Sequence, residues 1–581
     1  MEIRHTKPAD MDAVLALYDA ARCFMAENGN PDQWVNGYPG ADQLSLDMAS
    51  GGSYVCVDGS AIVGTFYFAL GDEPNYHRID GGSWLNDRPY GVVHRITSAP
   101  GTRGVASFCL AWCFAQCGNI RIDTHRNNIP MQKTLIKNGY LVDPANQVQA
   151  YLNLVLENGK VTAVTEDEPE ADQVIDAKGK VVAPGFIDIH MHEDPVKDGK
   201  IEFCIFDAML RMGVTTAVGG NCGINVYDPV KYLDMVEKDG APVNVMLFAG
   251  HQYFRETAGA MDKYAPVTKE QQKHMKKGLE KALEAGCVGI SYGLRYVPGT
   301  GRDEFLDTAS CCEKEHRMIS AHVRDDEDRV FGAVAEVAEA GKLYNIPVQV
   351  SHIGSMAGFG QMKQLLRQVD GYRMNGIDVA CDCYPYFAFS TRIGATTYDD
   401  GWLERYHCDY SACQLTEGKY KGQRCTPETF AEMRRDFPEC LTVCYVMDEN
   451  DIRMAFADPG VMVGSDGLID NGHGHPRAAG TFPRFLSEFV RKGDISLYDG
   501  IEKMTAAPAK RLGLSNKGRL NVGADADVVI FDMEKIQDGA NFDDPMIPPT
   551  GIDYVLIGGE VAAKDCKIVK GDLGTALRKL S

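Results

Sequence analysis

The chain has 581 residues, of which 44% are hydrophobic and 24% charged, and its net charge is −22. The length exceeds what one hydrophobic core usually supports, so we expect at least two domains. The acidic balance argues against nucleic-acid partners, which require a basic surface, and against binding to anionic membranes. No apolar run is long enough to span a membrane, and the first residues lack the apolar core of a signal peptide. We therefore expect a cytoplasmic protein whose 18 cysteines are mostly reduced.

Residues 1–145 mix helix patterns with short strands. Apolar residues recur with helical spacing over 11–18. Two strand-like runs at 54–57 and 62–68 are separated by a glycine, which predicts a hairpin. An amphipathic helix is predicted over 106–117, after a glycine-containing loop. Together these signals predict an α+β domain.

A different pattern begins near residue 152. Apolar strands flank an Asn-Gly pair at 158–159, a pair typical of a hairpin turn. Residues 518–531 return to short alternating strands, and we expect them to pair with the strands near 152. This predicts a small β-sandwich domain built from 150–185 and 510–581.

Residues 186–509 alternate short apolar strands with helix-like stretches. The predicted strands end near residues 190, 218, 249, 291, 322, 351, 383 and 465. Eight buried parallel strands with helical crossovers predict an α/β fold, the (β/α)8 or TIM barrel. The turn-rich stretch 392–445 is predicted to be an insertion over the barrel mouth. Because active sites of such barrels lie at the C-terminal ends of the strands, the residues that end each strand are the functional candidates.

Five of the predicted strands end in residues that can bind a metal or transfer a proton. They are His190 and His192 after the first strand, Cys222 after the second, His322 after the fifth, His352 after the sixth and Asp466 after the eighth. Each alone is more often structural, but unrelated core residues would not all select strand ends. Imidazole and thiolate are favoured zinc ligands. A nearby carboxylate, for which Asp466 is the candidate, can take a proton from water and later protonate a leaving amine. The set therefore predicts metal-assisted hydrolysis of an amide or a related bond.

Ordered motifs occur at 184–192, 213–216, 220–223, 289–299, 322–325, 384–386, 464–467, 475–477 and 480–484. Through these motifs, residues 152–575 resemble the amidohydrolase superfamily and, within it, the D-aminoacylase (N-acyl-D-amino-acid deacylase) family. The resemblance implies a zinc hydrolase that cleaves small N-acyl-D-amino acids into a carboxylate and a D-amino acid.

The resemblance also implies roles for individual residues. A tight zinc would be held by Cys222, His322 and His352, and a second, weaker position by His190 and His192 with Cys222 between the two. Asp466 would act as general base and acid, Tyr296 would contact the scissile carbonyl or its oxyanion, and Arg477 would bind the substrate carboxylate.

Two features depart from the family pattern. Gly354 stands where the family has a lysine two residues after the second histidine, so Arg295 and Arg392 become candidates for carboxylate binding. The strand pair that normally precedes the segment at 152–165 is expected to be absent. A D-dipeptidase or a cyclic-amide hydrolase of the same superfamily therefore remains an alternative.

The first 141 residues carry motifs at 94–97, 101–106, 121–128 and 139–140 that resemble GNAT-type acetyltransferases. The resemblance implies acetyl-CoA binding by loop amides at a helix N-terminus. The matching residues are Arg103, Gly104, Ala106 and Asn127. An acetyl-CoA-dependent transferase with an inactive barrel is the alternative from another class, and the intact strand-end residues argue against it.

Overall fold

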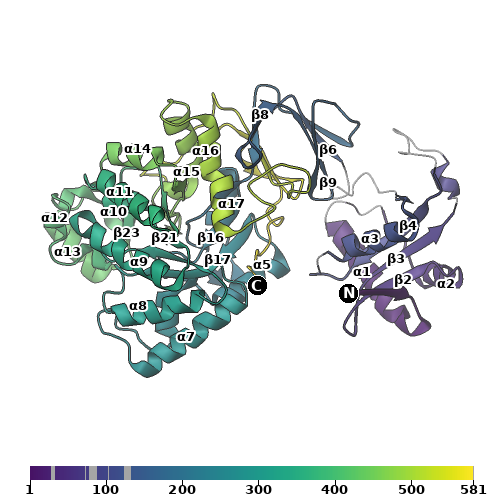
Figure 1. The fold of residues 1–581 in the computed structure, drawn as a ribbon, viewed down its shortest axis with the longest axis horizontal. Helices are drawn as coiled ribbons and strands as arrows, with labels where there is room; N and C mark the ends of the chain where they lie inside the picture. The colour runs from purple at the N-terminus through teal and green to yellow at the C-terminus, as the bar shows by residue number, and fades with distance from the viewer. Residues whose placement is uncertain are drawn as a thin grey trace. The chain divides into compact units, whose positions relative to one another are not determined.

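The computed structural model describes residues 1–27, 30, 33–71, 73–77, 88–102, 104–122 and 133–579. The chain forms two compact units (Figure 1). The first contains Met1–Lys133 with Pro169–Gln173, and the second contains Thr134–Glu168 with Val174–Ser581. No helix of the described residues is both long and apolar enough to cross a membrane.

The first unit is built on a five-stranded sheet in the order β1-β2-β3-β4-β5. Its elements are β1 (Glu2–His5), α1 (Met11–Glu27), α2 (Ala41–Ala49), β2 (Ser53–Asp58), β3 (Ala61–Leu70), β4 (Gly91–Ser98), α3 (Val105–Cys117) and β5 (Ile120–Arg121). The predicted hairpin is confirmed, because β2 and β3 pair antiparallel. Strands β4 and β5 pair in parallel, and α3 is the crossover between them. The helix is less amphipathic than predicted, because Phe114 is 55% exposed.

Two sheets of the second unit form its β domain. One has the order β10-β9-β6-β11 and the other β32-β31-β30-β29-β12-β7-β8. The strands are β6 (Thr134–Lys137), β7 (Tyr140–Asp143), β8 (Val148–Tyr151), β9 (Asn153–Glu157), β10 (Lys160–Thr165), β11 (Gln173–Asp176), β12 (Val181–Pro184), β29 (Val528–Phe531), β30 (Ile552–Ile557), β31 (Glu560–Lys564) and β32 (Lys567–Ile568). Side chains of both sheets share one core, which includes Ile136, Leu154, Val182 and Val528. As predicted, the C-terminal strands pair with the N-terminal ones, through β12 and β29.

The predicted boundary between the parts, at 145–150, is wrong. Strands β6 to β8 at 134–151 belong to the sheets of the second unit, so the strand pair expected to be absent is present. Gly139 fits the acetyltransferase motif in sequence, but in the structure it belongs to this β domain. A Cβ on Gly139 would lie 2.4 Å from Val182 Cγ2, so the close approach of β7 to β12 requires a glycine.

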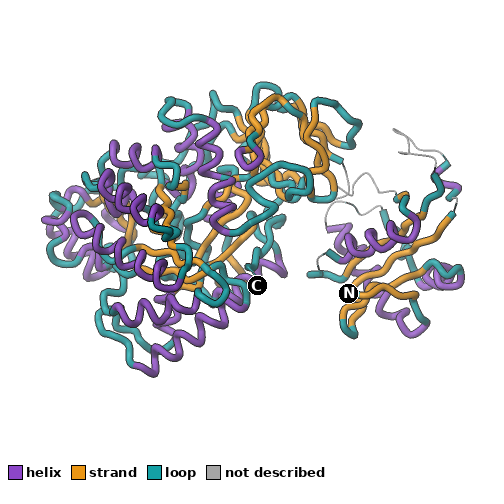
Figure 2. Tube along the Cα trace, viewed as in Figure 1, coloured by secondary structure: helices purple, strands orange, loops and turns teal. Residues whose placement is uncertain are grey.

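The rest of the second unit is a barrel whose strands lie inside a layer of helices (Figure 2). The strands are β13 (Phe186–Asp188), β16 (Val214–Gly219), β17 (Asn244–Leu247) continued by β18 (Ala249–Gly250), β19 (Gly289–Gly293), β20 (Met318–His322), β21 (Val348–Val350), β22 (Val379–Cys383) and β26 (Val461–Val463). Neighbours pair in parallel, and the last position returns to the first because His192 N donates to Gly467 O at 3.0 Å. The predicted eight-stranded barrel is therefore confirmed.

Helices connect these strands. They are α4 (Ile205–Arg211), α5 (Pro229–Asp239), α6 (His251–Thr257), α7 (Lys269–Glu284), α8 (Arg302–Ala309), α9 (Val330–Tyr344), α10 (Ile353–Ala357), α11 (Met362–Met374), α14 (Glu449–Ala457), α15 (Arg477–Phe485), α16 (Leu497–Met504) and α17 (Ala506–Leu512). The predicted insertion forms its own sheet of β23 (Phe389–Arg392), β25 (Leu441–Cys444) and β24 (Cys413–Leu415), with α12 (Trp402–Arg405) and α13 (Pro427–Asp436).

Candidate active site

The strand-end residues converge at the C-terminal end of the barrel. His190, Cys222, His352 and Asp466 each follow a different barrel strand, and all four are buried. Their potential ligand atoms lie within 4.8 Å of one another. The ring centroid of His322 is 4.6 Å from that of His352. The sequence-predicted candidates therefore form one cluster.

The spacing of these donors fits a zinc ion. Cys222 Sγ lies 3.5 Å from His190 Nε2 and 3.4 Å from His352 Nε2. Tetrahedral zinc, with bonds of about 2.3 Å to sulfur and about 2.0 Å to nitrogen, places such atoms about 3.6 Å apart. His322 Nδ1 is buried and has no hydrogen-bond partner among the described residues. The cluster therefore offers one sulfur and several imidazole nitrogens that form no strong bond among the described residues, and a zinc site requires such donors.

Three residues of the cluster have a strained backbone. The φ angles of Cys222, His352 and Asp466 are 54°, 32° and 50°, in the left-handed region that non-glycine residues rarely adopt. Each stands two or three residues beyond its strand, where the chain turns out of the barrel. Such strain persists only where the surrounding structure imposes it, and it is concentrated at functional sites.

Asp382, on β22, orients two of the histidines, and sequence reasoning missed it. Its Oδ1 lies 3.1 Å from His190 Nδ1 and accepts a hydrogen bond from His352 N at 2.7 Å. Ser355 Oγ lies 2.9 Å from His352 Nδ1. These partners leave the Nε2 atoms of both rings facing Cys222. The available signal was an acidic residue inside an otherwise apolar strand of the barrel.

Cys222 and Asp466 are both held in their ionised forms. Burial alone would raise the pKa of the Cys222 thiol, but the charges of His190 and His352 bring it well below its ordinary value. Burial also opposes ionisation of Asp466, yet Arg477 and the neighbouring histidines hold the pKa of its carboxyl well below its usual range. The cluster therefore offers a thiolate and a carboxylate at neutral pH.

Asp466 sits between imidazoles and a guanidinium. Its Oδ1 lies 3.1 Å from His192 Nε2 and its Oδ2 lies 2.8 Å from Arg477 Nη1. Arg477 is buried, with its guanidinium carbon 4.7 Å from the centre of the Tyr384 ring. The residue predicted to bind the substrate carboxylate thus contacts the predicted general base.

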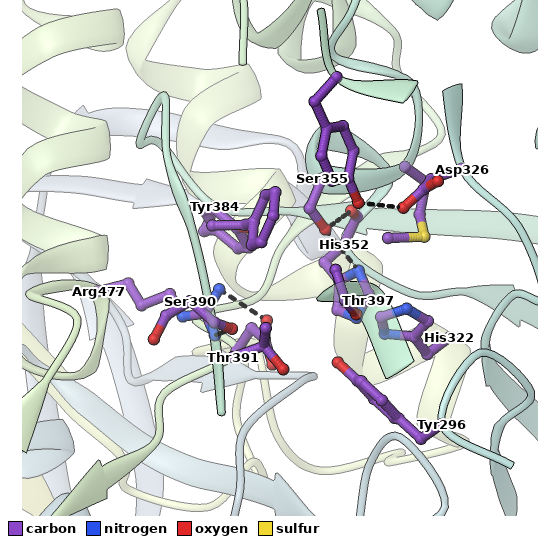
Figure 3. A pocket seen from close by; sticks show the side chains of 14 residues that line it. Tyr296, His322, Asp326, His352, Ser355, Tyr384, Ser390, Thr391, Thr397 and Arg477 are labelled. Atoms are coloured by element: carbon purple, nitrogen blue, oxygen red, sulfur yellow. Dashed lines mark hydrogen bonds and ion pairs between the residues drawn. The ribbon is translucent and has the colours of Figure 1, made fainter. Parts of the chain in front are cut away.

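A small cavity opens beside this cluster (Figure 3). It is lined by Tyr296, His322, Asp326, His352, Ser355, Met356, Tyr384, Phe389, Ser390, Thr391, Thr397, Tyr406, Asp466 and Arg477. Burial and the neighbouring negative charges of Cys222 and Asp466 raise the pKa of Tyr296 well above its ordinary value, so its hydroxyl stays protonated. The cavity therefore combines a proton acceptor, a phenol donor and a guanidinium.

Two predicted substrate-binding residues do not line this cavity. Arg295 Nη1 is paired with Asp325 Oδ1 at 3.0 Å. Arg392, whose side chain is 41% exposed, is paired with Glu439. The presence of glycine at position 354 also has a structural explanation, because a Cβ there would lie 2.7 Å from Ile452 Cδ1. The turn after His352 leaves no room for the lysine side chain of the family pattern.

The predicted acetyl-CoA residues lie in the first unit. Gly104 caps α3 with a φ of 70°, and Ala106 lies in its first turn. Arg103 and Asn127 lie outside the described residues.

A closed (β/α)8 barrel with imidazole, thiolate and carboxylate donors at its strand ends defines a metal-dependent hydrolase. Comparisons with known proteins identify the family. The profile described as "Amidohydrolase family" matches residues 173–295 and 453–563. N-acyl-D-glutamate deacylase of Alcaligenes xylosoxydans xylosoxydans is 32% identical over 455 residues, which cover 73% of this chain and 92% of that protein. The chain belongs to the amidohydrolase family.

Two further relatives match about three quarters of the chain. D-aminoacylase of the same organism is 29% identical over 464 residues, covering 73% of this chain and 93% of that protein. The crystal structure of N-acyl-D-glutamate deacylase from Bordetella bronchiseptica, complexed with zinc and a phosphonate inhibitor, superposes with a TM-score of 0.69 at 30% identity. The match covers 77% of this chain and all of that one.

Proposed function

We propose that this protein hydrolyses the amide bond of N-acyl-D-amino acids, giving a carboxylate and a free D-amino acid, with zinc as its cofactor. The observation that carries the proposal is the convergence of Cys222, His352 and Asp466 at the barrel mouth. The relationship to deacylases named for linear N-acyl-D-amino acids favours these substrates over cyclic amides.

The proposed zinc ligands at the tight position are Cys222, His322 and His352. His190 and His192 would serve a second, weaker position that shares Cys222. Zinc, when bound, lowers the pKa of water to about 7 and polarises a carbonyl.

Asp466 is the proposed general base and acid. Its low pKa keeps it ionised in the resting site, so it can accept the proton of the attacking water. The same carboxyl then donates that proton to the leaving amine. Its position 3.1 Å from His192 Nε2 keeps it beside the proposed metal ligands throughout.

Tyr296 and Arg477 are the proposed substrate contacts. Tyr296 remains a hydrogen-bond donor over the working pH range and is proposed to stabilise the developing oxyanion. Arg477 Nε makes no hydrogen bond among the described residues, so this edge of the guanidinium can receive the substrate carboxylate while Nη1 stays on Asp466.

The proposal is tested with a panel of N-acetyl-D- and N-acetyl-L-amino acids, D-dipeptides and cyclic amides. Release of free amine from the N-acetyl-D compounds, abolished by chelation and restored by zinc, is the expected result. Preferred cleavage of dipeptides or cyclic amides, or an Asp466→Ala variant that keeps its rate, would overturn it.

For the first unit we propose a GNAT-like acyl-CoA-binding fold. The supporting observation is the parallel β4–β5 pair with α3 as its crossover, because amides at the N-terminus of such a helix are suited to binding a phosphate. Calorimetric titration of the full-length protein with acetyl-CoA tests this proposal. Binding is expected, and no heat at millimolar ligand would overturn it.

A further inference from the structure

The charges inside the cavity are unevenly placed. Besides histidines, the charged residues among the described lining are Asp326, Asp466 and Arg477. Figure 3 shows Arg477 on one side of the cavity and Asp326 on the other, with His322 and His352 closer to Asp326. Since Arg477 is the one lysine or arginine in this lining, it is the natural partner for the α-carboxylate of the substrate. The opposite end of the bound substrate then faces Asp326.

Asp326 lines the other end of the cavity and carries a carboxylate. The residue is only 2% exposed, and its Oδ2 accepts a hydrogen bond from Tyr406 Oη at 2.5 Å. Its Oδ1 lies 3.1 Å from Arg405 Nε but has no hydrogen-bond partner among the described residues. Arg405 does not line the cavity, and it donates through Nη2 to Thr397 O. Asp326 therefore belongs to the lining of this end of the cavity, whereas the guanidinium paired with it does not.

No lysine or arginine of the described lining compensates the charge of Asp326, and Arg405, which pairs with it, lies outside that lining. Met356, Phe389 and Tyr406 contribute apolar surface to the cavity lining, and Tyr406 contacts Asp326 directly. Gly354 removes the lysine expected from the family pattern, and Ile452 Cδ1 occupies the space its side chain would need. Because Arg405 is already paired with Asp326, a carboxylate brought here would lose its water without gaining an unpaired cation, which is unfavourable.

We propose that Asp326 makes the site selective for N-acyl-D-amino acids with uncharged or cationic side chains, and that it excludes D-glutamate and D-aspartate. This inference rests on the proposed deacylase function. The side chain occupies the Asp326 end while the α-carboxylate binds Arg477. An amide side chain such as that of D-glutamine donates to Asp326, whereas the isosteric carboxylate of D-glutamate is repelled by it.

The test compares isosteric substrates that differ in one charge. kcat/KM is measured for N-acetyl-D-glutamine against N-acetyl-D-glutamate, and for N-acetyl-D-asparagine against N-acetyl-D-aspartate. The wild-type enzyme is expected to prefer the amide by about tenfold or more in each pair. Asp326→Asn is expected to bring the ratio toward one, mainly by raising the rate with the acidic substrate.

Asp325→Asn is the matched control. Asp325 is the next residue in the chain and pairs with Arg295 outside the cavity lining, so its neutralisation is expected to leave the ratio unchanged. Asp326→Ser provides a second neutral variant if the asparagine protein does not fold, and melting temperatures monitor both.

A wild-type ratio near one, or a ratio that neutral variants of Asp326 leave unchanged, would overturn the proposal. So would discrimination that follows the charge of the acyl group, tested with N-succinyl substrates, instead of the side chain. Hydrolysis of none of these N-acyl-D-amino acids would refute the proposed function itself, and that result is distinct from equal hydrolysis of both members of a pair.

Discussion

Arg477 Nη1 lies 2.8 Å from Asp466 Oδ2, so a guanidinium proposed for substrate binding also sets the charge of the proposed general base. Both side chains are less than 10% exposed, and the pair is therefore only weakly screened by water. A guanidinium has five donors in a fixed fork. One edge can stay on Asp466 while the remaining donors bind a second carboxylate. Substrate binding and proton transfer are thereby coupled through one residue.

Replacement of Arg477 separates these two effects. In Arg477→Gln, loss of the cation is expected to raise the pKa of Asp466, so the base becomes protonated at a higher pH. The acidic limb of the kcat/KM profile should therefore move to higher pH, together with a rise in KM of about tenfold or more from the lost carboxylate contact.

Arg477→Lys serves as the matched variant, because it keeps a positive charge but loses the fork. It should raise KM while the acidic limb stays near its wild-type position. If the glutamine variant keeps the wild-type pH profile, Arg477 does not control the ionisation of Asp466. The measurement is kcat/KM between about pH 4 and 9 for all three proteins.

Asp382→Asn tests the orientation of the proposed metal ligands. Asp382 contacts His190 Nδ1 and accepts from His352 N, and partners of this kind typically change metal affinity by about 10- to 100-fold. We expect zinc affinity to fall by that factor with little change in secondary structure, measured by competition with a chelator. Asp378→Asn is the control, because Asp378 lies just before the same strand and pairs with Arg511. Equal affinity in the two variants would contradict a role for Asp382.

Cys222→Ala tests the proposed shared ligand. The thiolate has two imidazole nitrogens within 3.5 Å, so its removal takes away the central donor of the cluster. We expect the purified variant to contain less than about a tenth of the wild-type zinc. Cys204→Ala, at a half-buried cysteine outside the cluster, should retain its metal. A Cys222→Ala protein with full zinc content would show that the ion is held elsewhere.

The barrel was predictable from sequence because buried parallel strands are continuous apolar runs, and their ends are marked by polar residues. That pattern alone predicts the positions of His190, Cys222, His352 and Asp466 at the ends of strands. The role of Asp382 was not predicted, because an acidic residue between two cysteines of a strand does not reveal from sequence which side chains it contacts in the fold. The ion pairs of Arg295 with Asp325 and of Arg392 with Glu439 depend on how loops approach one another, which spacing does not encode.

The prediction of the domain boundary was wrong for a related reason. Gly139 matched a motif of another family, while its requirement comes from the approach of Val182, which lies more than forty residues later in the chain. The strands at 134–151 are short, and their partners are β9, β11, β12 and one another. Local pattern alone therefore assigned them to the wrong unit.

Lys503 predicts a pH dependence of stability that is separate from catalysis. Its ammonium is buried and donates to the carbonyls of Asp458 and Val461, and burial lowers its pKa from 10.5 to about 8. Between these two values the unfolded chain binds more protons than the folded one, so this group makes the free energy of unfolding rise with pH. Below pH 8 Lys503 is protonated in both the folded and the unfolded state. Its contribution to the free energy of unfolding is then about 3 kcal/mol smaller than above pH 10.5.

Lys503→Met removes this titration. The free energy of unfolding of the wild type minus that of the variant is expected to increase by about 3 kcal/mol between pH 7 and 10.5, as measured by urea unfolding at several pH values. Lys238→Met is the control, since that side chain is 81% exposed, and its difference from wild type should not change over the same range. A constant difference for Lys503→Met would mean that the ammonium is as well solvated in the fold as in the unfolded chain.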